Sequence, residues 1–186
     1  EALVTADLDT ILTAYKNLNV KWNQYEQPIR SQSIGMYGKI ETQLAFIRIA
    51  LANEQVDFNL VQAQYDAFKL YIEQFLAGAD VEVEIGNYSL QSLVDLIDDA
   101  FDAMDRGDYA TASGHLTEFI MIWPNVEMEV STRNGNLYNE LESHMPILVS
   151  ELMRKQVNVE QVDTQLQRYK TEIQLLQTDA SYTYWD

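Results

Sequence analysis

Apolar side chains recur every three or four residues along almost the whole chain. This spacing places them on one face of an α-helix, where they can pack against neighbouring helices. The pattern predicts helices within about 8–22, 37–51, 56–75, 89–106, 108–123, 135–155 and 158–178. The fold class is therefore predicted to be all-α, a helical bundle of about seven helices.

Start and stop signals punctuate these helices. Gly78 and Gly107 each follow an apolar stripe and are predicted to end a helix. Pro124 predicts a break, because proline has no N–H to donate within a helix. Asn134 or Asn136 is expected to cap the helix that follows. The chain has only three prolines and seven glycines, which is typical of helices joined by short loops.

The sequence contains an internal repeat. When the chain is shifted by 101 residues, Trp22 aligns with Trp123 and Glu26 with Glu127. The register continues without a gap through the pairs Tyr37/Tyr138, Glu41/Glu142, Leu51/Leu152, Val61/Val162, Lys69/Lys170 and Ile72/Ile173. A gapless register of this length predicts an internal duplication that produces two pseudo-symmetric units.

The repeat also defines the expected domain organisation. We predict a single domain over residues 1–186. Its parts are a first repeat unit (1–78), an acidic connecting segment with a helix (79–107) and a second repeat unit (108–186). Residues 79–108 hold nine acidic residues and one basic residue, Arg106. Each repeat unit is expected to consist of a helix, an irregular turn and two further helices.

Each unit carries the motif W-x3-E-x10-Y-x3-E across its first turn. The tryptophan and first glutamate are one helical turn apart, as are the tyrosine and second glutamate, so each pair shares a helix face. Large aromatic side chains contribute much of the apolar area of a core. Trp22 and Trp123 are therefore expected to be buried, each packing its own unit's turn.

The repeated glutamates are candidate metal ligands. If the units pack about a pseudo-two-fold axis, their carboxylates could converge on one point. Such a cluster is repulsive unless a cation or protons intervene, and oxygen ligands suit hard metal ions. The candidate ligands are Glu26, Glu41, Glu127 and Glu142.

A structural interpretation of the same glutamates stays open. A carboxylate near a turn can cap a helix, or accept a hydrogen bond from a tyrosine or tryptophan. In that case the four residues stabilise the fold and bind no metal.

Other titratable residues carry weaker signals. His115 with Glu118, and His144 with Glu140, have spacings that could hold a metal, but a solvated or partnered surface histidine is favoured for both. A run of aspartates at helical spacing is typical of a solvated face, with loose cation attraction as the alternative. These aspartates are Asp95, Asp98, Asp99, Asp102 and Asp105.

Charge and composition exclude several classes of protein. The net charge of −17 argues against binding to nucleic acid or to an anionic membrane surface, and favours cations or a basic partner. Hydrophobic residues make up 47% of the chain, so it is not a disordered acidic tail. There is no cysteine, and no apolar run approaches the roughly 20 residues that span a bilayer. Direct membrane insertion is therefore not expected.

Signatures of catalysis are missing from the sequence. It contains no Walker loop, dinucleotide fingerprint, G-x-S-x-G or H-E-x-x-H motif. Helical repeat scaffolds bind more often than they catalyse. We predict a binding domain and not an enzyme.

Three stretches carry a resemblance to a known family. GDYATASGHLTEF and WPNVEMEVSTRNGNLYNELESHM, within 107–145, resemble the extracytoplasmic domain of bacterial iron permeases of the oxidase-dependent, high-affinity iron transporter family. The final DASYTYWD resembles the segment before that family's first transmembrane helix. The R-E-x-x-E motif of the family's membrane helices is absent, so no transport residue can be carried over.

The resemblance implies an extracytoplasmic domain, in the periplasm or at the cell surface, attached to the membrane permease region of the same full-length protein. It implies iron as the metal, with another hard divalent cation as the alternative. The domain would capture iron, pass it on, or dock an accessory iron-binding protein or peroxidase. A metal-free helical scaffold that docks a protein partner is the rival hypothesis, and a redox-active carboxylate di-metal centre is the third.

Overall fold

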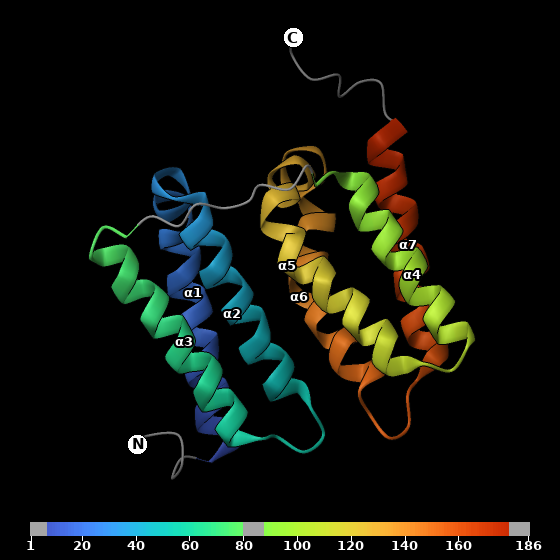
Figure 1. Cartoon of the computed structure of the whole chain (residues 1–186), viewed down its shortest axis with the longest axis horizontal. Coiled ribbons are helices and arrows are strands. Elements are labelled where there is room, and N and C mark those ends of the chain that lie inside the picture. The colour runs from blue at the N-terminus through green and yellow to red at the C-terminus, as the bar shows by residue number, and fades with distance from the viewer. Residues whose placement is uncertain (1–6, 80–87, 179–186) are drawn as a thin grey trace. The chain divides into compact units, whose positions relative to one another are not determined.

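The computed structural model describes residues 7–79 and 88–178, which form seven helices and no strand (Figure 1). The predicted all-α helical bundle is confirmed. The helices are α1 (Leu8–Gln32), α2 (Ile34–Ala52), α3 (Phe58–Leu76), α4 (Leu90–Asp105), α5 (Tyr109–Arg133), α6 (Gly135–Leu152) and α7 (Val159–Thr178).

The chain divides into two compact units, residues 1–84 and 85–186. The first unit contains α1–α3 and the second α4–α7. The sequence predicts that 79–107 is a connecting segment with a helix. In the structure that helix, α4, packs against α5 and α7 and so belongs to the second unit. The connection predicted over 79–89 falls mostly on residues 80–87, which lie outside the described residues.

The core of the first unit is built around α2. This helix packs against both α1 and α3, and it is apolar on several sides. Ile40, Leu44 and Ile47 of α2 are buried in one apolar cluster with Trp22 of α1 and Phe68 of α3. Each such side chain contributes about 1.5–3 kcal/mol when fully buried.

The second unit is a four-helix bundle. Consecutive helices pack against one another, and α7 closes the ring by packing on α4. Each helix contributes a side chain with 0–2% exposure to the shared core, for example Ile97, Leu116, Leu141 and Leu166. Apolar stripes on four helices thus cover one another, as in other bundles.

Glycine ends two helices, as the sequence predicts. Gly78 and Gly107 have φ of 78° and 72°, a region that L-residues with a side chain rarely adopt. After α4, the N–H of Asp108 donates to the carbonyl of Ala103 at 2.9 Å. After α3, the N–H of Ala79 donates to Gln74 at 3.0 Å. These hydrogen bonds satisfy carbonyls that would otherwise lack partners at the helix ends.

We expect Gly107→Ala to destabilise the second unit by about 1 kcal/mol, because alanine is strained at positive φ. The matched control is Gly114→Ala inside α5, where the added Cβ would meet no atom within 4 Å other than its chain neighbours and the surrounding helix backbone. There alanine should stabilise by roughly 0.5–1 kcal/mol. Urea denaturation measures both changes, and equal effects of the two substitutions would contradict the left-handed cap.

The predicted break at Pro124 is wrong, because α5 runs through this residue to Arg133. Proline removes one helical hydrogen bond, at a cost of about 3 kcal/mol. The helix continues because Ile122, Trp123 and Val126 are all buried around it, and their burial outweighs that loss.

The irregular turn that the repeat predicts, between α1 and α2 and between α5 and α6, is a single non-helical residue in each case. Ser33, with φ −155° and ψ 101°, separates α1 from α2. Asn134, with φ −149° and ψ 89°, separates α5 from α6. The side chains of Ser33 and Asn134 accept hydrogen bonds from the backbone N–H groups of Met36 and Leu137. Asn134 is thus confirmed as the cap of the following helix.

Helix boundaries in the two units can be compared in the 101-residue register. Helices α1 and α5 begin at residues 8 and 109 and end at 32 and 133. Helices α2 and α6 begin at 34 and 135, and α3 and α7 at 58 and 159. Each of these pairs of residues is 101 apart. Pseudo-symmetry between the units stays a prediction, which superposition of α1–α3 on α5–α7 tests.

Candidate functional site

In the first unit, three residues of the repeated motif are directly connected. The indole Nε1 of Trp22 donates a hydrogen bond to Oε1 of Glu41. The rings of Trp22 and Tyr37 are stacked, with centroids 6.0 Å apart and an interplanar angle of 16°. Trp22 lies on α1 and the other two residues on α2, so these contacts join the two helices.

The second unit contains the same contacts. Nε1 of Trp123 donates to Oε1 of Glu142, and the rings of Trp123 and Tyr138 stack at 6.0 Å and 22°. Trp22 and Trp123 are 5% and 6% exposed, so the prediction that both are buried is confirmed. Packing covers the rings, and the carboxylate satisfies the one polar group that each indole carries.

These contacts test the structural interpretation, in which the glutamates cap helices or accept hydrogen bonds from aromatic side chains. Glu41 and Glu142 accept hydrogen bonds from tryptophan, as that interpretation expects. Helix capping is wrong for all four glutamates, because each lies inside its helix. The caps that begin these helices are Asp7, Ser33, Asp108 and Asn134. An indole donor to a carboxylate is charge-assisted, and it fixes the orientation of the carboxylate.

Glu26 lies one turn after Trp22 on α1 and is half-buried. Burial raises the pKa of Glu26 from its ordinary value, and the nearby charge of Arg30 partly offsets the rise. The guanidinium of Arg30 lies 5.1 Å from the centre of the Tyr37 ring. This cation–π contact has no counterpart in the register, where residue 131 is Ser131.

Glu127, the register counterpart of Glu26, is 1% exposed on α5. Burying a carboxylate is costly unless it is hydrogen-bonded, protonated or paired with a cation. The two units therefore hold the first glutamate of the motif in different environments. A glutamate at this depth is a functional candidate on physical grounds.

The predicted convergence of four carboxylates involves both units. Glu26 and Glu41 belong to the first unit, and Glu127 and Glu142 to the second. Over residues 7–79 and 88–178, no group of three or more histidine or acidic side chains is arranged to hold a metal ion. A single four-glutamate site stays a prediction.

His144 and Glu140, a pair whose spacing could hold a metal, each contact another residue of the second unit. Nδ1 of His144 lies 3.3 Å from the hydroxyl of Tyr169, so the prediction of a partnered surface histidine is confirmed for this residue. Glu140 instead pairs with Arg168 at 2.9 Å. Burial raises the pKa of Tyr169 to about 12.

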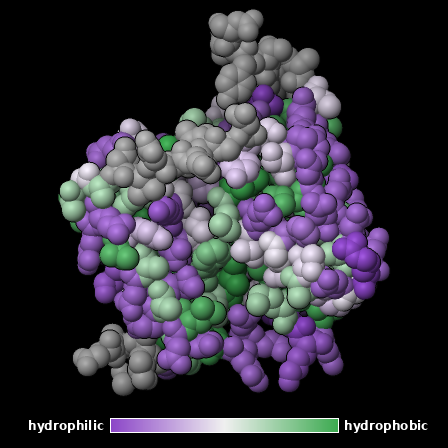
Figure 2. All heavy atoms as spheres, viewed as in Figure 1, coloured by the Kyte–Doolittle hydropathy of each residue, from purple (hydrophilic) through white to green (hydrophobic). Residues whose placement is uncertain are grey.

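The aspartate run on α4 forms a solvated face. Asp95, Asp99, Asp102 and Asp105 are exposed, and hydrophilic side chains cover this side of α4 and α7 (Figure 2). Asp98 is the exception, because it accepts an ion-paired hydrogen bond from Nζ of Lys170. The aspartates thus keep α4 hydrated on its outer side and attach it to α7.

Two features near the motif were missed by sequence reasoning. One is Arg30, which shapes the environment of Glu26 and Tyr37. The other is Ser33, which occupies the same place in the 101-residue register as the predicted cap Asn134. Both are good N-cap residues, so the register combined with capping preference could have located the break between helices.

The comparisons with known proteins support a distant relation to iron permeases. The chain is 20% identical over 185 residues to the iron permease EfeU of Bacillus subtilis (strain 168). The match covers 97% of this chain and 37% of the permease, so the chain spans less than half of its relative's length. No protein-family model matches the chain. No solved structure matches it either.

These findings confirm the coarser part of the predicted resemblance, the relation to an iron permease. Among the helices of the described residues, none has the length and apolar character that crossing a bilayer requires. The residues 179–186, which carry part of the predicted resemblance, lie outside the described residues.

Proposed function

We propose that this chain is an extracytoplasmic domain of an iron permease, which binds iron and delivers it to the membrane region of the same protein. The observation that carries the proposal is the similarity to an iron permease along 97% of the chain. The partners of this domain are the permease region itself and an accessory iron-binding protein or peroxidase. No catalytic step is assigned to it.

The repeated glutamates supply the chemistry for binding iron or another hard divalent cation. Glu26 and Glu41 are the candidate ligands of the first unit, and Glu127 and Glu142 those of the second. Carboxylates that bind metals are commonly held by hydrogen bonds from a second layer of residues. The indole donors of Trp22 and Trp123 have that role toward Glu41 and Glu142.

The negative charge of the chain supports the same proposal. A net charge of −17 concentrates cations near the surface and speeds their encounter with a binding site. This attraction is diffuse and screened by salt, whereas coordination by carboxylates is short-range. Measurements at physiological ionic strength therefore separate the two effects.

The test is an anaerobic titration of the metal-free chain with Fe²⁺ at physiological ionic strength, followed by calorimetry. We expect saturable binding. One ion per chain supports a single site of four carboxylates, and two ions support one half-site in each unit. Heat that never saturates, or that salt abolishes, would contradict the proposal and favour the metal-free scaffold.

A further inference from the structure

The first unit has an apolar groove between α1 and α3. Both helices pack on α2, and two adjoining hollows of about 490 and 420 Å³ run between them. Leu18 and Lys21 of α1 line both hollows. Val61 lines one hollow and Phe68 the other, so α3 forms the opposite wall of the groove.

In the second unit, the corresponding position is filled by a helix. The 101-residue register pairs α1 with α5 and α3 with α7. Helix α4 packs against both α5 and α7 and completes the four-helix bundle (Figure 1). The first unit thus has three of the four helices that the second unit has.

Side chains in the groove of the first unit are more exposed than their register counterparts in the second unit, as expected if the first unit lacks a fourth helix. Leu116, Phe119 and Leu166 of the second unit are 0%, 1% and 0% exposed. Their register counterparts in the groove are Tyr15, Leu18 and Tyr65. Tyr15 and Leu18 are half-buried, and Tyr65 is 37% exposed. Farther along, Tyr25 and Leu76 also line the groove and are 61% and 77% exposed.

We propose that this groove binds an amphipathic helix from outside these 186 residues, with the chemistry of α4. The occupant has apolar side chains at helical spacing, because the walls of the groove are apolar. Burying such a stripe is the usual way in which a helix binds a groove. In α4 the corresponding stripe is Leu90, Leu93, Val94, Ile97, Ala100 and Met104, all buried.

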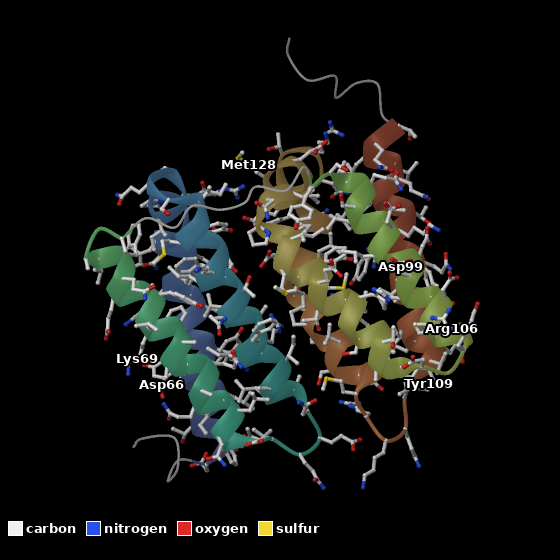
Figure 3. The ribbon with its side chains drawn as sticks, in the orientation of Figure 1. Asp66, Lys69, Asp99, Arg106, Tyr109 and Met128 are labelled. Atoms are coloured by element: carbon white, nitrogen blue, oxygen red, sulfur yellow. The ribbon has the colours of Figure 1, made fainter. Side chains whose placement is uncertain are left out.

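Charge complementarity adds an acidic residue to the occupant. Lys170 of α7 binds Asp98 of α4, and the register counterpart of Lys170 is Lys69 of α3. Lys69 lies 5.5 Å from the ring centre of Tyr65, a groove residue. Its ion pair is a local one with Asp66 at 3.5 Å on the same helix (Figure 3). A carboxylate on the bound helix would pair with Lys69 as Asp98 does with Lys170.

A second copy of this chain is a poorer occupant. Its only helix of this chemistry among the described residues is α4, which is already packed on α5 and α7. Withdrawing α4 would expose Leu93 and Ile97, which are each 0% exposed. Burying the same side chains in the groove of another copy could at best recover the free energy lost in this way. The inference does not depend on iron binding, since none of the four glutamates lines the groove.

The experiment uses a fluorescent peptide of residues 88–107, which contains α4 and two flanking residues at each end, titrated against the full chain. We expect saturable binding that Lys69→Glu weakens by about threefold or more, in the range of one exposed ion pair. Against Lys69→Glu, a peptide with Asp98→Lys should recover the lost affinity. Lys155→Glu, the same charge change in the second unit, should leave binding unchanged.

A groove variant completes the test. Leu18→Glu places a charge in the groove and should abolish binding, while circular dichroism checks that the helices are retained. Peptide binding that ignores both Lys69→Glu and Leu18→Glu would overturn the proposal, and so would no binding at all. Concentration-dependent dimerisation that Leu18→Glu abolishes would also overturn it, because a second copy would then be the occupant.

Discussion

Replacing either motif tryptophan with alanine should lower the free energy of unfolding of its unit by about 3–5 kcal/mol. Both rings are buried, and each stacks on the motif tyrosine of the next helix. Alanine removes that packing and leaves a cavity. It also takes the indole donor away from Glu41 or Glu142, so a part-buried carboxylate loses a charge-assisted hydrogen bond.

Urea denaturation of Trp22→Ala and Trp123→Ala, followed by far-ultraviolet circular dichroism, measures these losses. Tryptophan→Phe at the same positions is the matched control, because phenylalanine keeps an aromatic ring but not the N–H. Its loss should be smaller than that of alanine. The difference between the two substitutions reports the indole hydrogen bond together with the remaining volume change. Alanine variants as stable as the unaltered chain would contradict the assignment of these residues to the core.

Local signals in the sequence predict the number of helices and most of their starts. They miss two ends, because α1 runs to Gln32 and α5 to Arg133, beyond the predicted 8–22 and 108–123. Gly78 and Gly107 end helices as predicted, since no other residue adopts their left-handed conformation at so little cost. Apolar periodicity locates all seven helices, because each must bury a stripe against its neighbours.

The sequence predicts less well where tertiary packing overrides a local rule. Pro124 is a helix breaker in isolation, yet buried side chains on both sides carry α5 through it. The membership of α4 is a second case. Its amphipathic pattern shows that one face is buried but does not identify the helices that cover it. The contacts of α4 with α5 and α7 could therefore not be predicted from the sequence.

The sequence identifies the residues of the candidate site but not the contacts that they make. The motif places tryptophan and the second glutamate 19 residues apart, on two helices separated by one non-helical residue. That spacing is compatible with metal binding and with hydrogen bonding by the carboxylate, so it does not decide between the two roles. Periodicity likewise does not distinguish a half-buried Glu26 from a fully buried Glu127, because burial at that position depends on packing that differs between the units.

The double variant Glu26→Gln/Glu127→Gln should abolish saturable iron binding and leave the fold intact. Glutamine has nearly the shape of glutamate but carries no charge, so it is a poor ligand for a hard cation. The fold should survive in the first unit, because the raised pKa of Glu26 means that burial disfavours its charged form. The control is Glu73→Gln/Glu160→Gln, which changes one exposed glutamate in each unit by the same chemistry.

The same glutamate should make iron binding depend on pH. A proton and a cation compete for Glu26, and the raised pKa lets the proton compete at higher pH than at an ordinary glutamate. Iron affinity should therefore fall as the pH decreases through that pKa, by up to about tenfold per pH unit for one displaced proton. The single variant Glu26→Gln should bind more weakly and with a shallower pH dependence, because that proton is no longer displaced. An unchanged pH profile in Glu26→Gln, or saturable iron binding in the double variant equal to that of its control, would remove these glutamates from the site.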